Sequence, residues 1–122
     1  MEQQKILRVL KYSIYNNELW YYELPVLKET EKAVYLATDL LNLKQVNKSK
    51  LDILIQTKGD KQIALKVNSL SNDQTSYFYL YSLSTDLDAL KLIMKHYLVE
   101  IATGMMELEP TVIKEIDDGN SI

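Results

Sequence analysis

The chain has 122 residues, of which 47% are apolar and 25% are charged, and its formal net charge is −3. This length fits one domain with its own core, and these fractions exclude wholesale disorder. No apolar stretch approaches the roughly 20 residues that cross a bilayer, and the first residues lack the apolar core of a signal peptide. We therefore expect a soluble, cytoplasmic protein with no membrane partner.

The residue types that most enzymes use are scarce. There is no cysteine, His96 is the single histidine, and the three glycines lie far apart in the chain. These counts exclude disulfides, thiolate catalysis, cysteine-based zinc sites and glycine-rich phosphate loops. Catalysis by carboxylates alone stays open, because glycosidases and two-metal nucleases need only Asp and Glu. Since the acidic residues are scattered, we expect no enzymatic activity, no metal site and no cofactor.

The basic residues argue against a nucleic-acid partner. Thirteen of the 14 basic residues are lysines, and Arg8 is the single arginine. Specific nucleic-acid binding uses arginine for bidentate contacts and a basic surface for counterion release. This acidic chain has neither feature.

Six segments have the β-branched and aromatic residues, bounded by turn residues, that are typical of strands. They are residues 5–15, 19–28, 33–38, 51–57, 61–68 and 77–83. Pro25 lies inside the second segment and cannot donate a ladder hydrogen bond, so we expect it at a sheet edge or a bulge. Residues 39–50 fit a strand or a helical turn; we favour a strand or irregular segment that ends in a turn at 47–50.

A long helix is predicted after the last of these strands. Thr85 and Asp88 have the spacing of a capping box, with acidic residues in the first helical turn. Apolar residues then recur without interruption at steps of three and four. The helix should end at Gly104, as a left-handed cap, or at Glu109 before a proline.

These elements predict an α+β fold: an antiparallel sheet of six or seven strands, curled or partly closed, followed by one long C-terminal helix that packs on one face. Residues 1–109 form this single domain. Residues 110–122 form a tail that is either partly disordered or a short added element.

The most unusual feature is a run of tyrosines in the last predicted strand. Alternation along a strand places Tyr77, Tyr79 and Tyr81 on one face, and Phe78 and Leu80 on the other. We expect the face of Phe78 and Leu80 to meet the helix. The tyrosine face is then half-exposed, because a tyrosine ring buries well while its hydroxyl seeks a partner.

Trp20 and Tyr22 form a second alternating pair on the second predicted strand. If the two strands are neighbours, the five rings form one aromatic platform, which suits stacking of a nucleobase or anchoring of a protein partner. The alternative is ordinary cross-strand packing within a sheet. Without an arginine nearby, a protein or a small nucleotide fits this platform better than a nucleic-acid strand.

Apolar residues occupy more of the surface of the predicted helix than packing on one sheet face usually buries. Burial against a second copy of the chain would hide the excess, which predicts a homodimer. The residues expected at that contact are Met94, Ile101, Met105 and Met106. Alternatively, a curled sheet wraps the helix within one chain.

Three segments carry a likeness to a known group: KETEKAVYL at residues 28–36, VNKSKLDI at 46–53 and YLYSLSTDLDALKLIMKHYLVEI at 79–101. They resemble small proteins encoded by phages and prophages of AT-rich bacteria, in which a charged E-T-E-K turn, an N-K-S turn and a terminal helix follow one another. This chain has Ala33 where that group usually has threonine, and its helix is more apolar. The resemblance implies an accessory phage protein of the anti-defence type.

Three hypotheses follow from the resemblance and the aromatic platform. The first is a non-catalytic inhibitor that binds a bacterial defence protein in the host cell. The second is a sponge that sequesters a nucleotide signal molecule on the platform. The third is a small virion assembly protein.

Overall fold

The computed structural model describes residues 5–13, 15–37, 44–58, 61–64, 77–98 and 105–114. In these ranges the chain forms one α-helix, α1 (Leu87–Tyr97), and two short 3₁₀-helices, η1 (Lys48–Lys50) and η2 (Met105–Glu107). It also forms eight strands: β1 (Ile6–Ser13), β2 (Glu18–Glu29), β3 (Ala33–Leu36), β4 (Gln45–Asn47), β5 (Leu54–Lys58), β6 (Lys61–Ala64), β7 (Tyr77–Ser82) and β8 (Thr111–Lys114).

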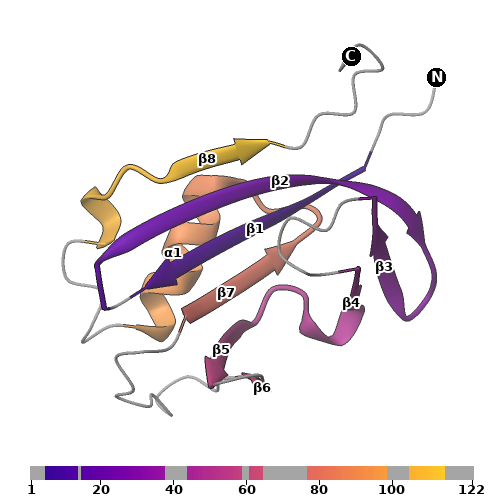
Figure 1. Cartoon of the computed structure of the whole chain (residues 1–122), viewed down its shortest axis with the longest axis horizontal. Helices are drawn as coiled ribbons and strands as arrows, with labels where there is room; N and C mark the ends of the chain where they lie inside the picture. Colours follow the sequence, from indigo (N-terminus) through magenta and orange to yellow (C-terminus); the bar gives the residue numbers. More distant parts are fainter. Residues whose placement is uncertain are drawn as a thin grey trace.

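The strands form one curled sheet, open like half a barrel, in the order β4-β3-β2-β1-β7-β5-β6 (Figure 1). All neighbours along this path are antiparallel, and β8 adds to β2 in parallel. The predicted α+β fold with a curled antiparallel sheet is confirmed. Strand β4 falls in the segment that the sequence left ambiguous, and the predicted turn at 47–50 contains η1.

Strand β2 organises the sheet because it has different partners along its two edges. One edge pairs with β1 from Glu18 to Pro25. The other edge pairs first with β8, as far as Glu23, and then with β3, from Val26 onwards. Pro25 lies between the residues that pair with β8 and those that pair with β3, so no ladder hydrogen bond on this edge needs its missing N–H. A bulge follows between Val26 and Lys28.

Each face of the sheet carries its own apolar cluster. On one face, side chains of β1, β2, β5 and β7 pack against α1 and η2, with Leu10, Phe78, Leu80, Leu90 and Met94 fully buried. The expectation that Phe78 and Leu80 meet the helix is therefore confirmed. On the other face, Val34, Leu36 and Val46 of β3 and β4 curl over residues of β1, β2 and β7.

The hairpin between β1 and β2 turns at Asn17, which has a positive φ of 51°. Asparagine tolerates this left-handed conformation better than most residues do. The Asn17 side chain also accepts a hydrogen bond of 2.8 Å from the Tyr12 hydroxyl. This hydrogen bond ties the turn to the buried Tyr12 ring.

The helix is shorter than predicted, and it is not the last element of the chain. Its N-cap is Asp86, whose carboxylate accepts a hydrogen bond of 2.9 Å from the Ala89 N–H. Thr85 belongs to the preceding turn, because its N–H donates to the Ser82 hydroxyl. Helix α1 ends at Tyr97, and Gly104, the predicted cap, lies outside the described residues. Among the described segments, no helix is long and apolar enough to cross a membrane.

The tail predicted at residues 110–122 contains β8, so its first part is an added strand. The apolar residues beyond Tyr97 that suggested a longer helix include Met105 and Leu108, which pack from η2 and the segment after it. Helical spacing alone does not distinguish one long helix from two elements that cover the same core.

The structure describes three of the four residues predicted at a dimer contact, and two of them are core residues. Met94 and Met105 are fully buried, and Met106 packs against the same cluster. Met94 and Met105 are thus buried within a single chain and leave no surface for a second copy, whereas Met106 is only partly buried. Ile101 lies outside the described residues.

Substitution within α1 tests this arrangement. Met94→Ala should lower the free energy of unfolding by about 3 kcal/mol, because it leaves a cavity in the core. Leu92→Ala, on the same helix but 58% exposed, should change that free energy by at most about 0.5 kcal/mol. Urea unfolding followed by circular dichroism measures both values. Equal effects would contradict the assignment of Met94 to the core.

Gln56 of β5 provides a second stability test. Its side chain is 1% exposed, and its amide nitrogen has no hydrogen-bond partner in the described part of the chain. A buried donor without a hydrogen-bond partner lowers the free energy of unfolding by about 1–3 kcal/mol. Gln56→Met should therefore raise the free energy of unfolding by about 1 kcal/mol. Gln45→Met, at an exposed position of β4, is the matched control and should leave it unchanged.

Candidate functional site

The five aromatic residues predicted to form a platform lie on one face of the sheet, the face opposite α1. Their strands β2 and β7 are not neighbours, because β1 lies between them. The registers produce two cross-strand rows from β2 through β1 to β7: Trp20–Lys11–Tyr79 and Tyr22–Val9–Tyr81. Tyr77 lies one row further along, opposite Ser13. The platform is therefore not continuous, and its centre is the side chain of Lys11.

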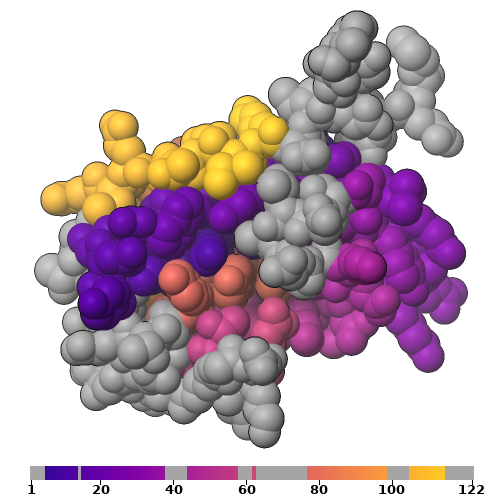
Figure 2. Space-filling view, viewed as in Figure 1, coloured from indigo at the N-terminus to yellow at the C-terminus, as the bar shows by residue number. Residues whose placement is uncertain are grey.

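Burial divides the five rings into two groups. Tyr22 and Tyr81 are buried in the apolar cluster that β3 and β4 cover. Trp20 and Tyr79 are half-buried, and Tyr77 is 38% exposed. Figure 2 shows atoms of β7 at the surface between β1 and β5. We call Lys11, Trp20, Tyr77 and Tyr79 the aromatic patch.

Lys11 is held within the aromatic patch by three rings. Its Nζ lies 4.5 Å from the ring centroid of Tyr77, 5.0 Å from that of Trp20 and 5.7 Å from that of Tyr79. At these distances the negative face of a ring attracts an ammonium group. Burial lowers the pKa of Lys11 from its ordinary value. The ammonium is thus partly removed from water and stabilised by rings.

Sequence reasoning missed Lys11, although a signal for it was present. In β1, Leu7, Val9 and Lys11 alternate with residues that face α1, so they share a sheet face. Because Lys11 follows two apolar residues on the same face of β1, its side chain is expected to lie next to apolar side chains. Only the register shows that its neighbours on both sides are aromatic.

Tyr81 supports the aromatic patch from the buried side. Its ring stacks on that of Tyr79, with centroids 6.0 Å apart and an interplanar angle of 12°. Its hydroxyl accepts a hydrogen bond of 3.4 Å from the Gln62 amide, whose oxygen accepts one from Lys50. Burial raises the pKa of Tyr81 to about 12. These contacts fix the plane of Tyr79.

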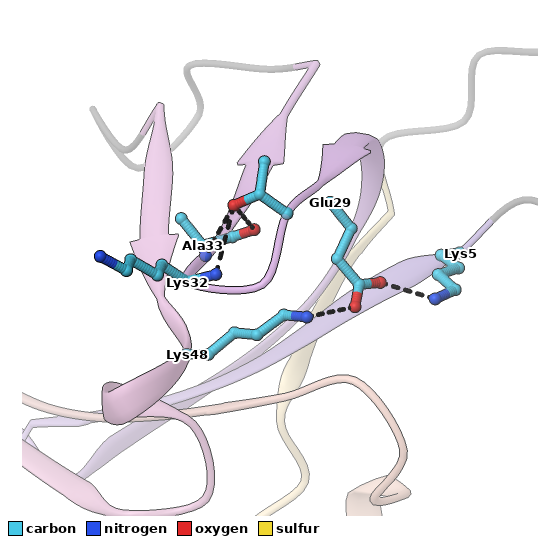
Figure 3. Close-up of polar contacts among 6 residues, drawn as sticks. Lys5, Glu29, Lys32, Ala33 and Lys48 are labelled. Carbon is cyan, nitrogen blue, oxygen red and sulfur yellow. Dashed lines mark hydrogen bonds and ion pairs between the residues drawn. The ribbon is translucent and has the colours of Figure 1, made fainter.

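The charged E-T-E-K segment forms a second polar surface, at the turn between β2 and β3 (Figure 3). Glu29 forms ion pairs with Lys48 at 2.5 Å and with Lys5 at 2.6 Å. Hydrogen bonds from these two lysines lower the pKa of Glu29 to about 2. The Thr30 hydroxyl accepts hydrogen bonds from the backbone N–H groups of Lys32 and Ala33, which closes the turn.

An open depression of about 530 Å³ borders this turn. It is lined by Thr30, Glu31, Lys32, Ala33, Tyr35, Gln45 and Asn47. None of the five aromatic residues predicted for binding lines it. Among the residues that the structure describes, no group of three or more histidines and carboxylates could hold a metal ion.

No protein-family model, curated protein or solved structure matches this chain. The candidate sites therefore rest on the geometry of the chain itself, and the aromatic patch and the E-T-E-K turn differ in their contacts. In the turn, Glu29 already has two lysine partners. The aromatic patch offers rings with exposed area around a cation that forms no ion pair with the described residues, which favours it as the binding surface.

Alkaline titration tests the buried tyrosines. Tyrosine in an unfolded chain loses its proton near pH 10, whereas Tyr21 and Tyr81 should keep theirs to about pH 12 in the folded protein. Between these values the folded state binds more protons, so the free energy of unfolding should fall as the pH rises. Tyrosinate absorbance should show a late step, which Tyr81→Phe diminishes. A late step that Tyr81→Phe leaves unchanged would contradict the burial of this hydroxyl.

Proposed function

We propose that the protein is a non-catalytic binding protein that inhibits a bacterial defence component by contacting it through the aromatic patch. The observation that carries this proposal is the gathering of Trp20, Tyr77 and Tyr79 around Lys11 on the sheet face opposite α1. Large aromatic residues dominate the energetics of protein interfaces. The resemblance of three sequence segments to phage proteins supports a defence component as the partner, and with it we propose that the protein acts in the host cytoplasm.

The aromatic patch is prepared for binding by the sheet beneath it. Lys11 and Tyr79 are on β1 and β7, each of which has a paired strand on both sides. Trp20 is on β2, between β1 and β8. The Trp20 and Tyr77 rings contact each other, with centroids 6.3 Å apart. Little conformational freedom is left to lose on association, which favours affinity.

A sponge for a nucleotide signal is the second candidate, and Lys11 is the observation that favours it. An ammonium next to aromatic rings combines a phosphate contact with a stacking surface. However, Tyr22 and Tyr81 are buried, and Lys11 lies over the three remaining rings. A base would have to displace Lys11 before it could stack. A protein partner can contact the rings and the ammonium together.

Capture from a bacterial lysate tests the proposed function. The wild-type protein should retain one host protein, and Trp20→Ala and Tyr77→Ala should each weaken the isolated complex at least about tenfold, as expected of interface hot spots. Tyr15→Ala is the matched control, because Tyr15 is 78% exposed in the turn after β1. It should bind as the wild type does. Thermal midpoints verify that each variant is folded.

Two further measurements separate the alternatives. A panel of cyclic nucleotides and ADP-ribose should not raise the thermal midpoint, whereas a tight ligand would raise it through mass action. The purified protein should show no turnover of nucleotides or nucleic acids. Turnover of a nucleotide or nucleic acid would overturn the proposal. A captured protein that binds both aromatic-patch variants as tightly as the wild type would also overturn it.

A further inference from the structure

We infer that the partner places an acidic side chain against Lys11 and a flanking apolar residue against Trp20 and Tyr77. This inference rests on the proposed function, because it names the kind of protein segment that the aromatic patch accepts. Its basis is the charge of Lys11, the rings that surround it and the position of the chain's single arginine.

Lys11 carries a charge that the described part of the chain does not match with a carboxylate. The ion pairs found there join Glu29 with Lys5 and Lys48, and Glu23 with Lys114. Glu18, opposite Ser13, is on the same sheet face as Lys11 but forms none of them. Aromatic rings attract a cation without neutralising it. A half-buried ammonium without a counter-charge is costly, so a carboxylate brought by a partner would remove part of that cost.

The rings around Lys11 determine what must accompany the carboxylate. Tyr77 and Trp20 are tilted by 59° to each other, and both lie within 5.0 Å of the ammonium, measured to the ring centroids. A group that reaches Lys11 therefore passes close to both rings. Apolar atoms next to the carboxylate gain dispersion contacts there and displace water from the rings.

A single ammonium suits a carboxylate better than a phosphate. A phosphate group carries more charge and is usually met by arginine or by several donors. Arg8 is on the other face of the sheet, in the Leu10 series, and its Nη1 donates to the Leu83 carbonyl at 3.4 Å. The aromatic patch thus offers one cation among rings, which matches a segment with one Asp or Glu beside a large apolar residue.

Selection from a library of random peptides displayed on phage tests the inference. Peptides retained by the wild-type protein should be enriched in Asp or Glu next to Leu, Ile, Phe or Trp. A synthetic copy of the best peptide should bind Lys11→Met at least tenfold more weakly than wild type. A second peptide, with Gln in place of Glu or Asn in place of Asp, should bind the wild-type protein at least tenfold more weakly than the original peptide does. Tyr15→Ala is the control and should bind the original peptide normally.

The outcomes distinguish this inference from the proposed function. If the selected peptides need Trp20 and Tyr77 but are neutral, or bind Lys11→Met equally well, the inference is overturned and the proposed function stands. If no selected peptide depends on the aromatic patch, both are overturned. If no acidic peptide is retained but a nucleotide raises the thermal midpoint, the patch takes a phosphate ligand and the inference is overturned. The second peptide keeps the test decisive even if Lys11→Met fails to fold.

Discussion

The position of β1 between β2 and β7 is the constraint on which the rest of the structure depends. On one face, this pairing aligns Tyr21, Leu10 and Leu80 into an apolar row against which α1 packs. On the other face, the next residues of the same strands align Trp20, Lys11 and Tyr79. Since side chains alternate along a strand, a shift of one residue in either pairing would send Lys11 into the core under α1. The core and the aromatic patch are therefore set by one register.

The two faces of the sheet are covered to different extents, and this difference creates the aromatic patch. Helix α1 and η2 cover the first face. On the second face, β3 and β4 cover the end of the sheet near Leu7 and Leu24, and the rings of the aromatic patch stay at or near the surface. The rings of the aromatic patch are therefore packed against cross-strand neighbours on the sheet, and their outer sides are exposed to solvent. Such a surface is rigid and partly apolar, and both properties favour association with another protein.

Glu29 and Lys11 differ in whether each has a partner of opposite charge among the described residues. Glu29 lies between two lysines at the surface, and its hydrogen bonds with them lower its pKa, as expected of a structural ion pair that links the residue before β1, the end of β2 and η1. Lys11 lies among rings, and burial lowers its pKa, as expected of a cation that has lost water and that pairs with no carboxylate of the described residues. The first arrangement joins three segments of the chain, whereas the second is the basis of the contact that we propose for a partner.

The sequence by itself determined the local structure. Alternation predicted the opposite faces of Phe78 and Tyr79, and turn residues marked the ends of the strand segments, because these signals depend on neighbours along the chain. Strand order, helix length and the role of Lys11 were decided by tertiary structure. Apolar spacing past Tyr97 fits one helix or two elements equally, so only packing shows that Met105 comes from η2. Likewise, no local signal shows that β1 lies between the two aromatic strands, because strand pairing joins residues that are distant in sequence and depends on which faces become buried together.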